Sequence, residues 1–441
     1  MRLSRLAVLL CLLFLPLAQG CSKETPAEHA ANVYAANEMA AAPVNANLPD
    51  FSLLPDKLAQ ADHLMTLSVT LHFSSQAWGI LQLILLLSFG GFAWMRDRAI
   101  ALSPNLWAQS YAFTLLYMVT HTVLSLPFSL YGHHLSLAYG FSVQSWGSWA
   151  LDLIKGLALN WLLYGLLAVA LFRLIGKLPR LWWLGFWAVC LPIALGIAYI
   201  NPILIDPMFN QFEPLALHHP DLSAKLEHMG VPPERQFLMK ASAKTTLPNA
   251  YVAGFAGSKR VVVWDTSLSP GQRIQPGVLW MVGHECGHYV LNHVRNGILM
   301  ALLMLPIAFY LAYRFLNAVL RRFGPRWRIP SPQDWAALAV LMLAYALIND
   351  IQEPFSNTIS RNVEHNADIY GMEAVHGLVP DPQAAMKDEI TADGLRGLND
   401  PNPAPWIEVL MFNHPATGRR AAFGKAYNPW ADGVGPKYFK K

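Results

Sequence analysis

Charged residues and cysteines are both scarce in this chain of 441 residues. Lys, Arg, Asp and Glu together make up 14% of the sequence, whereas hydrophobic residues make up 54%. A soluble fold of this size does not normally bury so much apolar surface, so the composition indicates a membrane protein. The four cysteines are scattered, which argues against a disulfide framework or a cysteine-rich structural metal site. A net charge of +4 is too small to indicate a nucleic-acid partner.

Long uncharged stretches account for the apolar excess. Six of them approach the length that a hydrocarbon core of about 30 Å requires. Arg and Trp residues flank several of these stretches, which is typical of membrane spans and not of helices buried in a large soluble protein. We expect spans at about 77–95, 107–130, 153–175, 181–203, 297–318 and 335–352.

The N-terminal residues form a separate unit. Arg2 and Arg5 precede an apolar run, and small residues then precede Cys21, so residues 1–20 are predicted to be a secretory signal. Lipidation of Cys21 and ordinary cleavage fit equally well, and a retained segment would add a seventh span. Residues 21–64, rich at first in Ala, Asn and Pro, are predicted to be a polar tether.

Basic residues are concentrated in three of the loops between the expected spans, whereas residues 131–151 contain no Lys or Arg. The positive-inside rule places the basic loops in the cytoplasm and the polar segments 206–295 and 353–441 on the opposite side. We therefore predict an integral protein of a bacterial inner membrane whose polar segments face the periplasm. The basic loop residues are Arg96, Arg98, Arg173, Lys177, Arg180, Arg314, Arg321, Arg322, Arg326 and Arg328.

A His-Glu-x-x-His motif begins at His284. In a helix, His284 and His288 lie on one face and can share a metal ion, while Glu285 lies beside them. Zinc peptidases use this arrangement, with two histidine ligands and a glutamate that acts on the attacking water. The motif is short, and a chain with 15 histidines can contain it by chance. Cys286 lies off the shared face and is expected to pack rather than bind metal.

A candidate third ligand lies in the segment Ser360–Asp368, which contains no Gly or Pro and is predicted to be helical. Glu364 and Asp368 share a face of that helix. Two histidines and one glutamate form a known catalytic zinc set with a fourth position open, so we expect one Zn²⁺ bound by both motif histidines and Glu364. Asp368 is suited to accept the second ring N–H of a histidine ligand, or else merely to pair with Arg361.

Taken together, these motifs resemble the integral-membrane zinc metallopeptidases of the type I CAAX prenyl endopeptidase family. The family pattern S-R-x-x-E-x-x-A-D is complete from Ser360 to Asp368. Asn249-Ala250-Tyr251 resembles the family's substrate-binding strand, and His414-Pro415 with Arg420 resembles its late H-P-x-x-x-x-R element. The resemblance covers roughly residues 120 to 420.

The resemblance also implies roles for individual residues. Glu285 would act as the base, His414 would donate to the developing oxyanion, and Arg420 would support the same region. Asn249, Ala250 and Tyr251 would bind the substrate backbone, as an exposed edge strand can.

The expected fold is mainly α, a multi-span membrane helix bundle with a small α+β zinc-peptidase domain formed by two segments that flank a transmembrane hairpin. Short β-type runs lie at 236–242, 249–255 and 259–265, and Pro276 is placed to open the motif helix. A helix continuous from His288 into the fifth span would put the metal near the membrane surface. After the signal and the tether, the expected units are a four-span region at 65–205, peptidase segments at 206–295 and 353–441, and the hairpin at 296–352.

The sequence therefore predicts a zinc metalloendopeptidase that cleaves membrane-associated or envelope polypeptides and has the lipid bilayer as its other partner. A prenyl-protein protease is one alternative, disfavoured because prenyl groups are added to intracellular proteins and this site is predicted to face outward. A non-catalytic scaffold stabilised by zinc is another, disfavoured because no ligand or base is missing.

Overall fold

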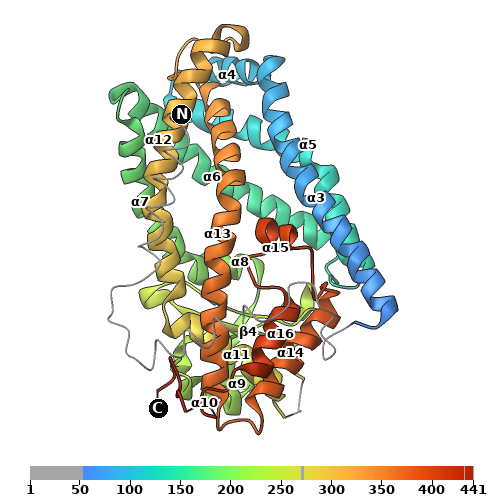
Figure 1. Ribbon diagram of the computed structural model, residues 1–441. Coiled ribbons are helices and arrows are strands. Elements are labelled where there is room, and N and C mark those ends of the chain that lie inside the picture. Colours follow the sequence, from blue (N-terminus) through green and yellow to red (C-terminus); the bar gives the residue numbers. More distant parts are fainter. Residues whose placement is uncertain (1–52, 270–272, 432, 441) are drawn as a thin grey trace, which may run out of the picture.

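A computed structural model describes residues 53–269, 273–431 and 433–440 (Figure 1). The predicted signal at 1–20, Cys21 and the tether up to residue 52 lie outside the described residues. Long helices fill the upper part of Figure 1, and a short sheet with smaller helices fills the lower part. The expected fold class, a mainly helical membrane bundle with a small α+β unit, is confirmed.

Six helical segments in the described residues are long and apolar enough to cross a membrane, which confirms the expected number. In the fourth, α7 continues through a π-helical turn, η1, into α8. A short helix, α4, lies between the first two. Their bounds are α3 Pro55–Ser88, α4 Gly91–Leu102, α5 Leu106–Ala138, α6 Trp146–Lys177, α7 Trp182–Ile200, η1 Asn201–Ile205, α8 Asp206–Phe209, α12 His293–Trp327 and α13 Ala337–Val375.

The first helix begins earlier than predicted. Residues 55–64 belong to α3, so the prediction that they form part of a tether is wrong. Ala61 in this stretch is fully buried and packs in a small cluster with Leu53 and Leu398. Packing against the C-terminal part of the chain thus extends the helix beyond its apolar core.

The predicted first span at 77–95 is also misplaced, because the helix does not run through it. Gly90 has a φ of +76°, a left-handed conformation that residues with side chains rarely adopt, and it separates α3 from α4. The apolar residues on both sides of Gly90 therefore belong to two helices.

Helix α13 joins the membrane region to the second peptidase segment without a break. It contains 39 residues, and the predicted boundary at 352/353 falls inside it. Polar residues such as Asp350 mark a change in environment rather than the end of the helix. The motif helix, α11 (Pro276–Val290), ends before the fifth span, although a continuous helix was considered from the sequence. Asn292, with a φ of +58°, changes the direction of the chain before α12 begins.

A mixed sheet of four strands lies beside α11. The strand order is β1-β2-β4-β3, with β2 and β4 parallel and the other pairs antiparallel, so β3 is an edge strand. Three strands lie in the predicted β-type runs, whereas β1 was missed because it has only three residues and ends in proline. The strands are β1 Phe212–Pro214, β2 Gln236–Met239, β3 Ala250–Ala253 and β4 Arg260–Trp264.

Short helices complete the lower unit, and its core is formed by side chains of α10, α11, α13, α14, α16 and the sheet. The C-terminal segment returns to this core, where the buried carboxylate of Glu373 accepts backbone N–H groups of Lys437, Tyr438 and Phe439. The remaining elements are α9 Leu215–His218, α10 Pro220–His228, η2 Pro233–Arg235, η3 Ala241–Ala243, η4 Ala256–Ser258, η5 Asp265–Ser267, α14 Pro382–Gly397, α15 Pro405–Met411 and α16 Thr417–Ala426.

Glycines allow α11 and α13 to cross closely. A Cβ on Gly371 would lie 2.9 Å from the backbone nitrogen of His284, and one on Gly287 would lie 2.8 Å from Cβ of Tyr370. Gly283 faces Gly371 across the same crossing. The two helices can therefore bring their side chains to a common point.

Replacing Gly371 with alanine is expected to destabilise the protein by about 1–3 kcal/mol, because the added methyl group would force the two helices apart. Thermal unfolding of the detergent-purified protein measures the change. Gly297→Ala is the matched control: Gly297 lies in α12 with open space around its Cβ position, so this change is expected to be neutral or slightly stabilising. Equal stabilities of the two variants would contradict the close crossing.

Candidate active site

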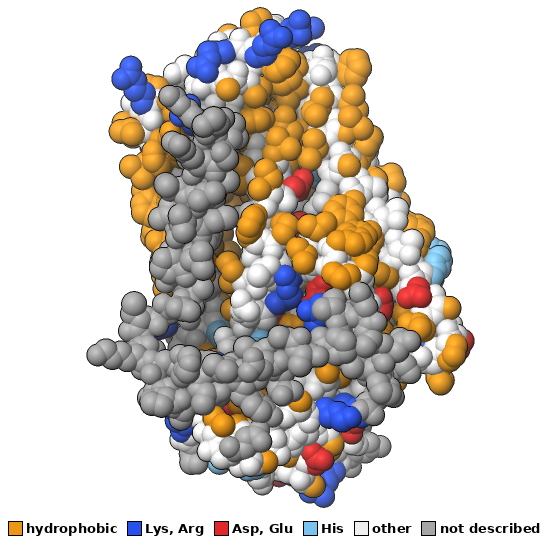
Figure 2. Space-filling model, in the orientation of Figure 1, with side chains coloured by type: hydrophobic (Ala, Val, Ile, Leu, Met, Phe, Trp, Pro, Cys, Tyr) orange, Lys and Arg blue, Asp and Glu red, His pale blue; other side chains and the backbone are white. Residues whose placement is uncertain are grey.

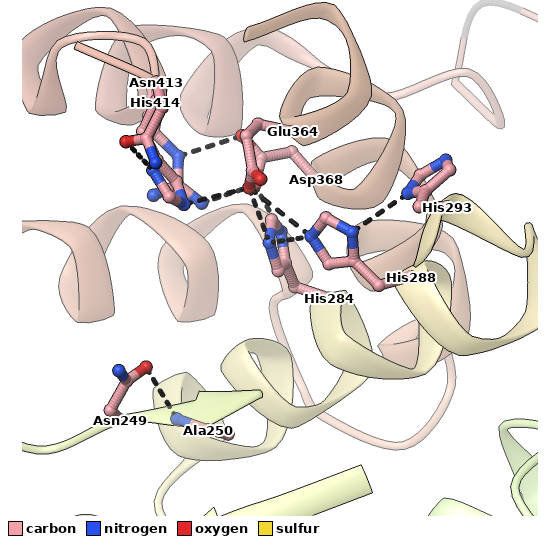
Figure 3. A network of polar contacts seen from close by, with 10 residues as sticks. Asn249, Ala250, His284, His288, His293, Glu364, Asp368, Asn413 and His414 are labelled. Carbon is pink, nitrogen blue, oxygen red and sulfur yellow. Dashed lines mark hydrogen bonds and ion pairs between the residues drawn. The ribbon is translucent and has the colours of Figure 1, made fainter. Parts of the chain in front are cut away.

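The three predicted metal ligands converge between α11 and α13 (Figure 3). Nε2 of His284 and Nε2 of His288 are 3.1 Å apart. Oε2 of Glu364 lies 3.2 Å from the first nitrogen and 3.4 Å from the second. One turn of α11 therefore supplies two candidate ligand atoms, and α13 supplies the third.

This triangle fits a tetrahedral metal. Ligand distances of about 2.0–2.1 Å imply ligand–ligand separations of about 3.3–3.4 Å, close to those found here. The buried Oε2 of Glu364 has no well-formed hydrogen bond within the part of the chain that the structure describes, so it is available as a donor atom. Glu285 groups with the two histidines within 4.8 Å, but the contacts of Glu364 with both Nε2 atoms make it the better third ligand.

Asp368 contacts the far side of the first histidine ligand. Its Oδ1 lies 2.7 Å from Nδ1 of His284, and Arg420 donates to both carboxylate oxygens at 2.6 and 3.0 Å. The structural alternative, a pair between Asp368 and Arg361, is wrong, since Arg361 donates instead to the backbone carbonyls of Glu408 and Phe412. The expected contact of Asp368 with a ligand histidine is present.

The carboxylates around the histidines favour positive charge. Burial lowers the pKa of His284, but the contacts with the carboxylates of Asp368 and Glu364 outweigh it and raise that pKa to about 10. The two carboxylates beside His284 make this cavity negative, which favours a bound cation. Burial raises the pKa of Glu285 above its ordinary value, and the neighbouring histidines oppose that rise. Both influences act on the carboxyl group that is the candidate general base.

His414 approaches the same point from the loop between α15 and α16. Its Nε2 lies 3.1 Å from Oε2 of Glu364, and its Nδ1 lies 2.9 Å from Oδ1 of Asn413. The side chain is about half exposed, at 49%, so one face of the ring is open to a ligand in the cavity.

A cavity of about 360 Å³ opens onto this cluster. Glu285 and His414 line it together with Trp280, Asp393 and Arg420. Its volume is in the range of ligand-binding pockets, and it places a bound chain beside the candidate base.

The side chains of the three residues of the predicted substrate strand lie in different surroundings. Asn249 lines the cavity, whereas Ala250 is buried and Tyr251 packs with Met239 on the other face of the sheet. Strand β3 begins at Ala250, and its pleat turns the side chains of Ala250 and Tyr251 to opposite faces of the sheet. Asn249 also fixes the strand, since its Oδ1 accepts the N–H of Ala250 at 2.8 Å.

A third histidine, His293, was missed by the sequence analysis. Its Nδ1 lies 3.0 Å from Nδ1 of His288, so each ligand imidazole has a partner on its far side. His293 follows His288 by five residues, a spacing that does not share a helical face. The change of chain direction at Asn292, between α11 and α12, brings His293 to His288. The only hint of this contact in the sequence is an asparagine, which tolerates a left-handed backbone, directly before His293.

A membrane-spanning helix bundle with a His-Glu-x-x-His site and a glutamate from a second helix defines a class of protein, the integral-membrane metallopeptidases. Comparison with known families agrees. Residues 52–211 match the family model "CAAX prenyl protease N-terminal, five membrane helices", and residues 219–426 match that of peptidase family M48.

Individual relatives show the same likeness. An uncharacterized metalloprotease of Bacillus subtilis, YhfN, is 30% identical over 321 residues, which cover 72% of this chain and 73% of the relative. CAAX prenyl protease 1 of Saccharomyces cerevisiae is 26% identical over 339 residues, 71% of each chain. The crystal structure of S. mikatae Ste24p has the same fold, with a TM-score of 0.70 at 19% identity over 91% of this chain and all of that one.

The chain belongs to peptidase family M48. It is an integral-membrane metalloendopeptidase, as its motifs predicted, and its relatives include the CAAX prenyl proteases.

Proposed function

We propose that this protein is a zinc endopeptidase of a bacterial inner membrane that cleaves membrane-associated or envelope polypeptides, with its metal site on the periplasmic side. One observation carries the proposal: two imidazoles and a carboxylate meet at ligand distances beside Glu285, in a cavity large enough for a peptide. Helix α13 runs from the membrane region directly to that cavity, which favours substrates that are embedded in the bilayer or emerge from it.

His284, His288 and Glu364 would hold the metal. When bound, zinc supplies Lewis-acid chemistry, polarising the scissile carbonyl and lowering the pKa of water. Two histidines and one carboxylate are a common ligand set for catalytic zinc, because three protein ligands leave the fourth coordination position open. A structural zinc site is usually closed by four protein ligands.

The protein's own groups would move the protons. Glu285 accepts a proton from the attacking water and returns it to the leaving amine, which requires the carboxylate to be ionised first. The half-exposed His414, whose Nε2 lies against Glu364 in the free protein, would donate to the oxyanion that develops on the scissile carbonyl. Arg420 acts indirectly. It donates to both carboxylate oxygens of Asp368 and so holds Asp368 in place beside His284. Asn249, at the start of the edge strand, would bind the substrate backbone, with Ala250 and Tyr251 shaping that strand rather than contacting substrate.

Asp368→Asn is expected to lower metal affinity by about 10–100-fold, because Asp368 orients the His284 ring and fixes the tautomer whose Nε2 can bind metal. Competition with a chelator measures the affinity. Asp393→Asn, a change of the same type in the same cavity, is the matched control and is expected to bind metal as the wild type does. Normal affinity in Asp368→Asn would remove the orienting role.

The periplasmic orientation follows from the basic loops and is tested by labelling single introduced cysteines with a membrane-impermeant maleimide. Glu227 in α10 and Arg322 in α12 are both exposed and lie in the polar unit and in a basic loop, respectively. Glu227→Cys is expected to react from the periplasm and Arg322→Cys only after the membrane is opened. The opposite pattern would place the metal site in the cytoplasm.

A second candidate, prenyl-protein proteolysis, is favoured by the names of the relatives, several of which are CAAX prenyl proteases. A farnesylated peptide and its unmodified form, offered in equal amounts, distinguish the two functions. We expect no preference for the farnesylated peptide, and a strong preference would establish the second candidate. Absence of cleavage of every polypeptide by metal-loaded protein would favour a non-catalytic scaffold.

A further inference from the structure

Several basic side chains gather at the end of the membrane bundle opposite the peptidase unit (Figure 2). Four of them, which we call the arginine cluster, are Arg321, Arg322, Arg326 and Arg328, in the last turns of α12 and directly after it. All four side chains are exposed. The positive charges of neighbouring arginines repel one another, and a bound anion would relieve this repulsion.

The carboxylates nearby do not neutralise the cluster. Asp97 and Asp334 both bind Arg96, at 2.9 and 2.7 Å. Within the described ranges, no carboxylate lies within the 4.0 Å ion-pair distance of an arginine of the cluster. The four guanidinium groups are therefore available to a ligand.

Two of the four line a hollow. Arg321 and Arg328 border it, and its remaining lining is mainly apolar: Leu320, Gly324, Pro325, Ile329 and Pro330. The hollow thus combines a cationic rim with an apolar wall on a membrane helix. Arg322 and Arg326 carry the same charge nearby but do not line it.

The backbone holds Arg328 at the rim. Its φ is +55°, and its carbonyl accepts a hydrogen bond of 2.7 Å from Arg96. The N–H of Ile329 donates to the carbonyl of Gly324 at 2.9 Å and closes the turn. The guanidinium lies beside Gly90, at the turn between α3 and α4. Hydrogen bonds therefore fix the backbone of Arg328 at the rim of the hollow.

Neighbouring side chains indicate that this hollow lies at a membrane–water interface. Phe89 is 84% exposed in the same α3–α4 turn, and Arg98 stacks over the exposed Trp94 at 5.7 Å. Exposed aromatic rings with arginines beside them are typical of the level of lipid headgroups. A ligand in the hollow would thus have its anionic group among the arginines and apolar chains against α12.

We propose that this hollow binds the phosphate headgroup of an anionic phospholipid, with Arg321 and Arg328 as its ligands. Guanidinium groups bind phosphate oxygens through paired, charge-assisted hydrogen bonds, and basic pockets between membrane helices recognise such headgroups. The site is separate from the metallopeptidase chemistry and adds a lipid ligand to the protein.

Native mass spectrometry of the detergent-purified full chain, titrated with phosphatidylglycerol, tests the site. We compare wild type with Arg321→Gln/Arg328→Asn, in which asparagine tolerates the left-handed backbone of Arg328. The matched control is Arg322→Gln/Arg326→Gln, which removes the same charge at the same end but leaves the hollow intact. Phosphatidylcholine and inorganic phosphate serve as the neutral lipid and the free anion. Gel filtration and thermal unfolding test whether each variant is folded. If the rim variant does not fold, the single variant Arg321→Gln takes its place.

Phosphatidylglycerol is expected to bind wild type and the control alike, and to bind the rim variant at least tenfold more weakly, with little binding of phosphatidylcholine. Equal weakening in both double variants would overturn the site in favour of diffuse charge attraction. Displacement of phosphatidylglycerol by inorganic phosphate at equal concentration would overturn the lipid as its ligand.

Discussion

Glu285→Gln is expected to bind metal as the wild type does and to lose peptide hydrolysis by about 10²–10⁴-fold, the usual contribution of a general base. The carboxylate lies beside both histidine ligands without forming the close contacts with their Nε2 atoms that Glu364 makes. Its amide replacement keeps the shape of the cavity but cannot accept the proton. Metal analysis and turnover of an unfolded membrane-protein substrate, measured on the same sample, separate the two effects.

Glu389→Gln is the matched control for this change. Glu389 lines the same cavity and bears the same carboxyl group, but it pairs with Arg396 at 3.6 Å rather than facing the ligand histidines. This variant is expected to keep most of the turnover. If Glu285→Gln lost its metal instead, Glu285 would be a ligand, and the roles of the two glutamates would have to be exchanged.

Glu364→Gln is expected to have the converse effect, losing most of its metal and its activity together. Glu364 is the single anionic donor in the triangle and contacts His284, His288 and His414. Without its charge, two neutral imidazoles remain, and these hold a divalent cation far less tightly. Metal content after gel filtration in the presence of a weak chelator measures the loss.

Glu353→Gln provides the comparison on the same helix. Glu353 lies in α13 on the membrane side of the site, where it pairs with His72 at 3.7 Å in a partly exposed position. An exposed pair of this kind contributes little to stability, so the variant is expected to retain metal and turnover. Full metal occupancy in Glu364→Gln would contradict the assignment of the third ligand.

The convergence of the candidate ligands was partly predictable, because each pair of side chains follows from helical spacing. His284 and His288 lie four residues apart, as do Glu364 and Asp368, so each pair had to share a face wherever its helix packed. The sequence did not determine how close the two helices come. That depends on Gly283, Gly287 and Gly371 meeting at one crossing, and this is a property of the packed pair.

Other features depend on contacts between distant parts of the chain. Arg420 reaches Asp368 across 52 residues, and Leu398 buries the first turns of α3. Periodicity within one segment carries no information about such pairings, so the helical part of the predicted tether was missed. The place of His293 depends on a change of chain direction at Asn292, which no helical repeat predicts.

Boundaries between membrane and polar segments were the least predictable. Polarity changes near Asp350, but α13 continues to Val375, because helical backbone hydrogen bonds are satisfied in either environment. The predicted end of the hairpin therefore marks a change from apolar to polar residues within one helix. The uninterrupted helix matters for function, since it holds Glu364 in a fixed relation to the membrane spans.

Removal and restoration of the metal test the central claim most directly. Detergent-purified wild type is assayed as isolated, after exhaustive chelation and after addition of zinc, with metal content measured each time. We expect about one zinc per active chain, loss of hydrolysis with the metal, and its return with zinc. Unchanged turnover by fully metal-free protein would contradict the account, because the cluster of His284, His288 and Glu364 would then have no part in the chemistry.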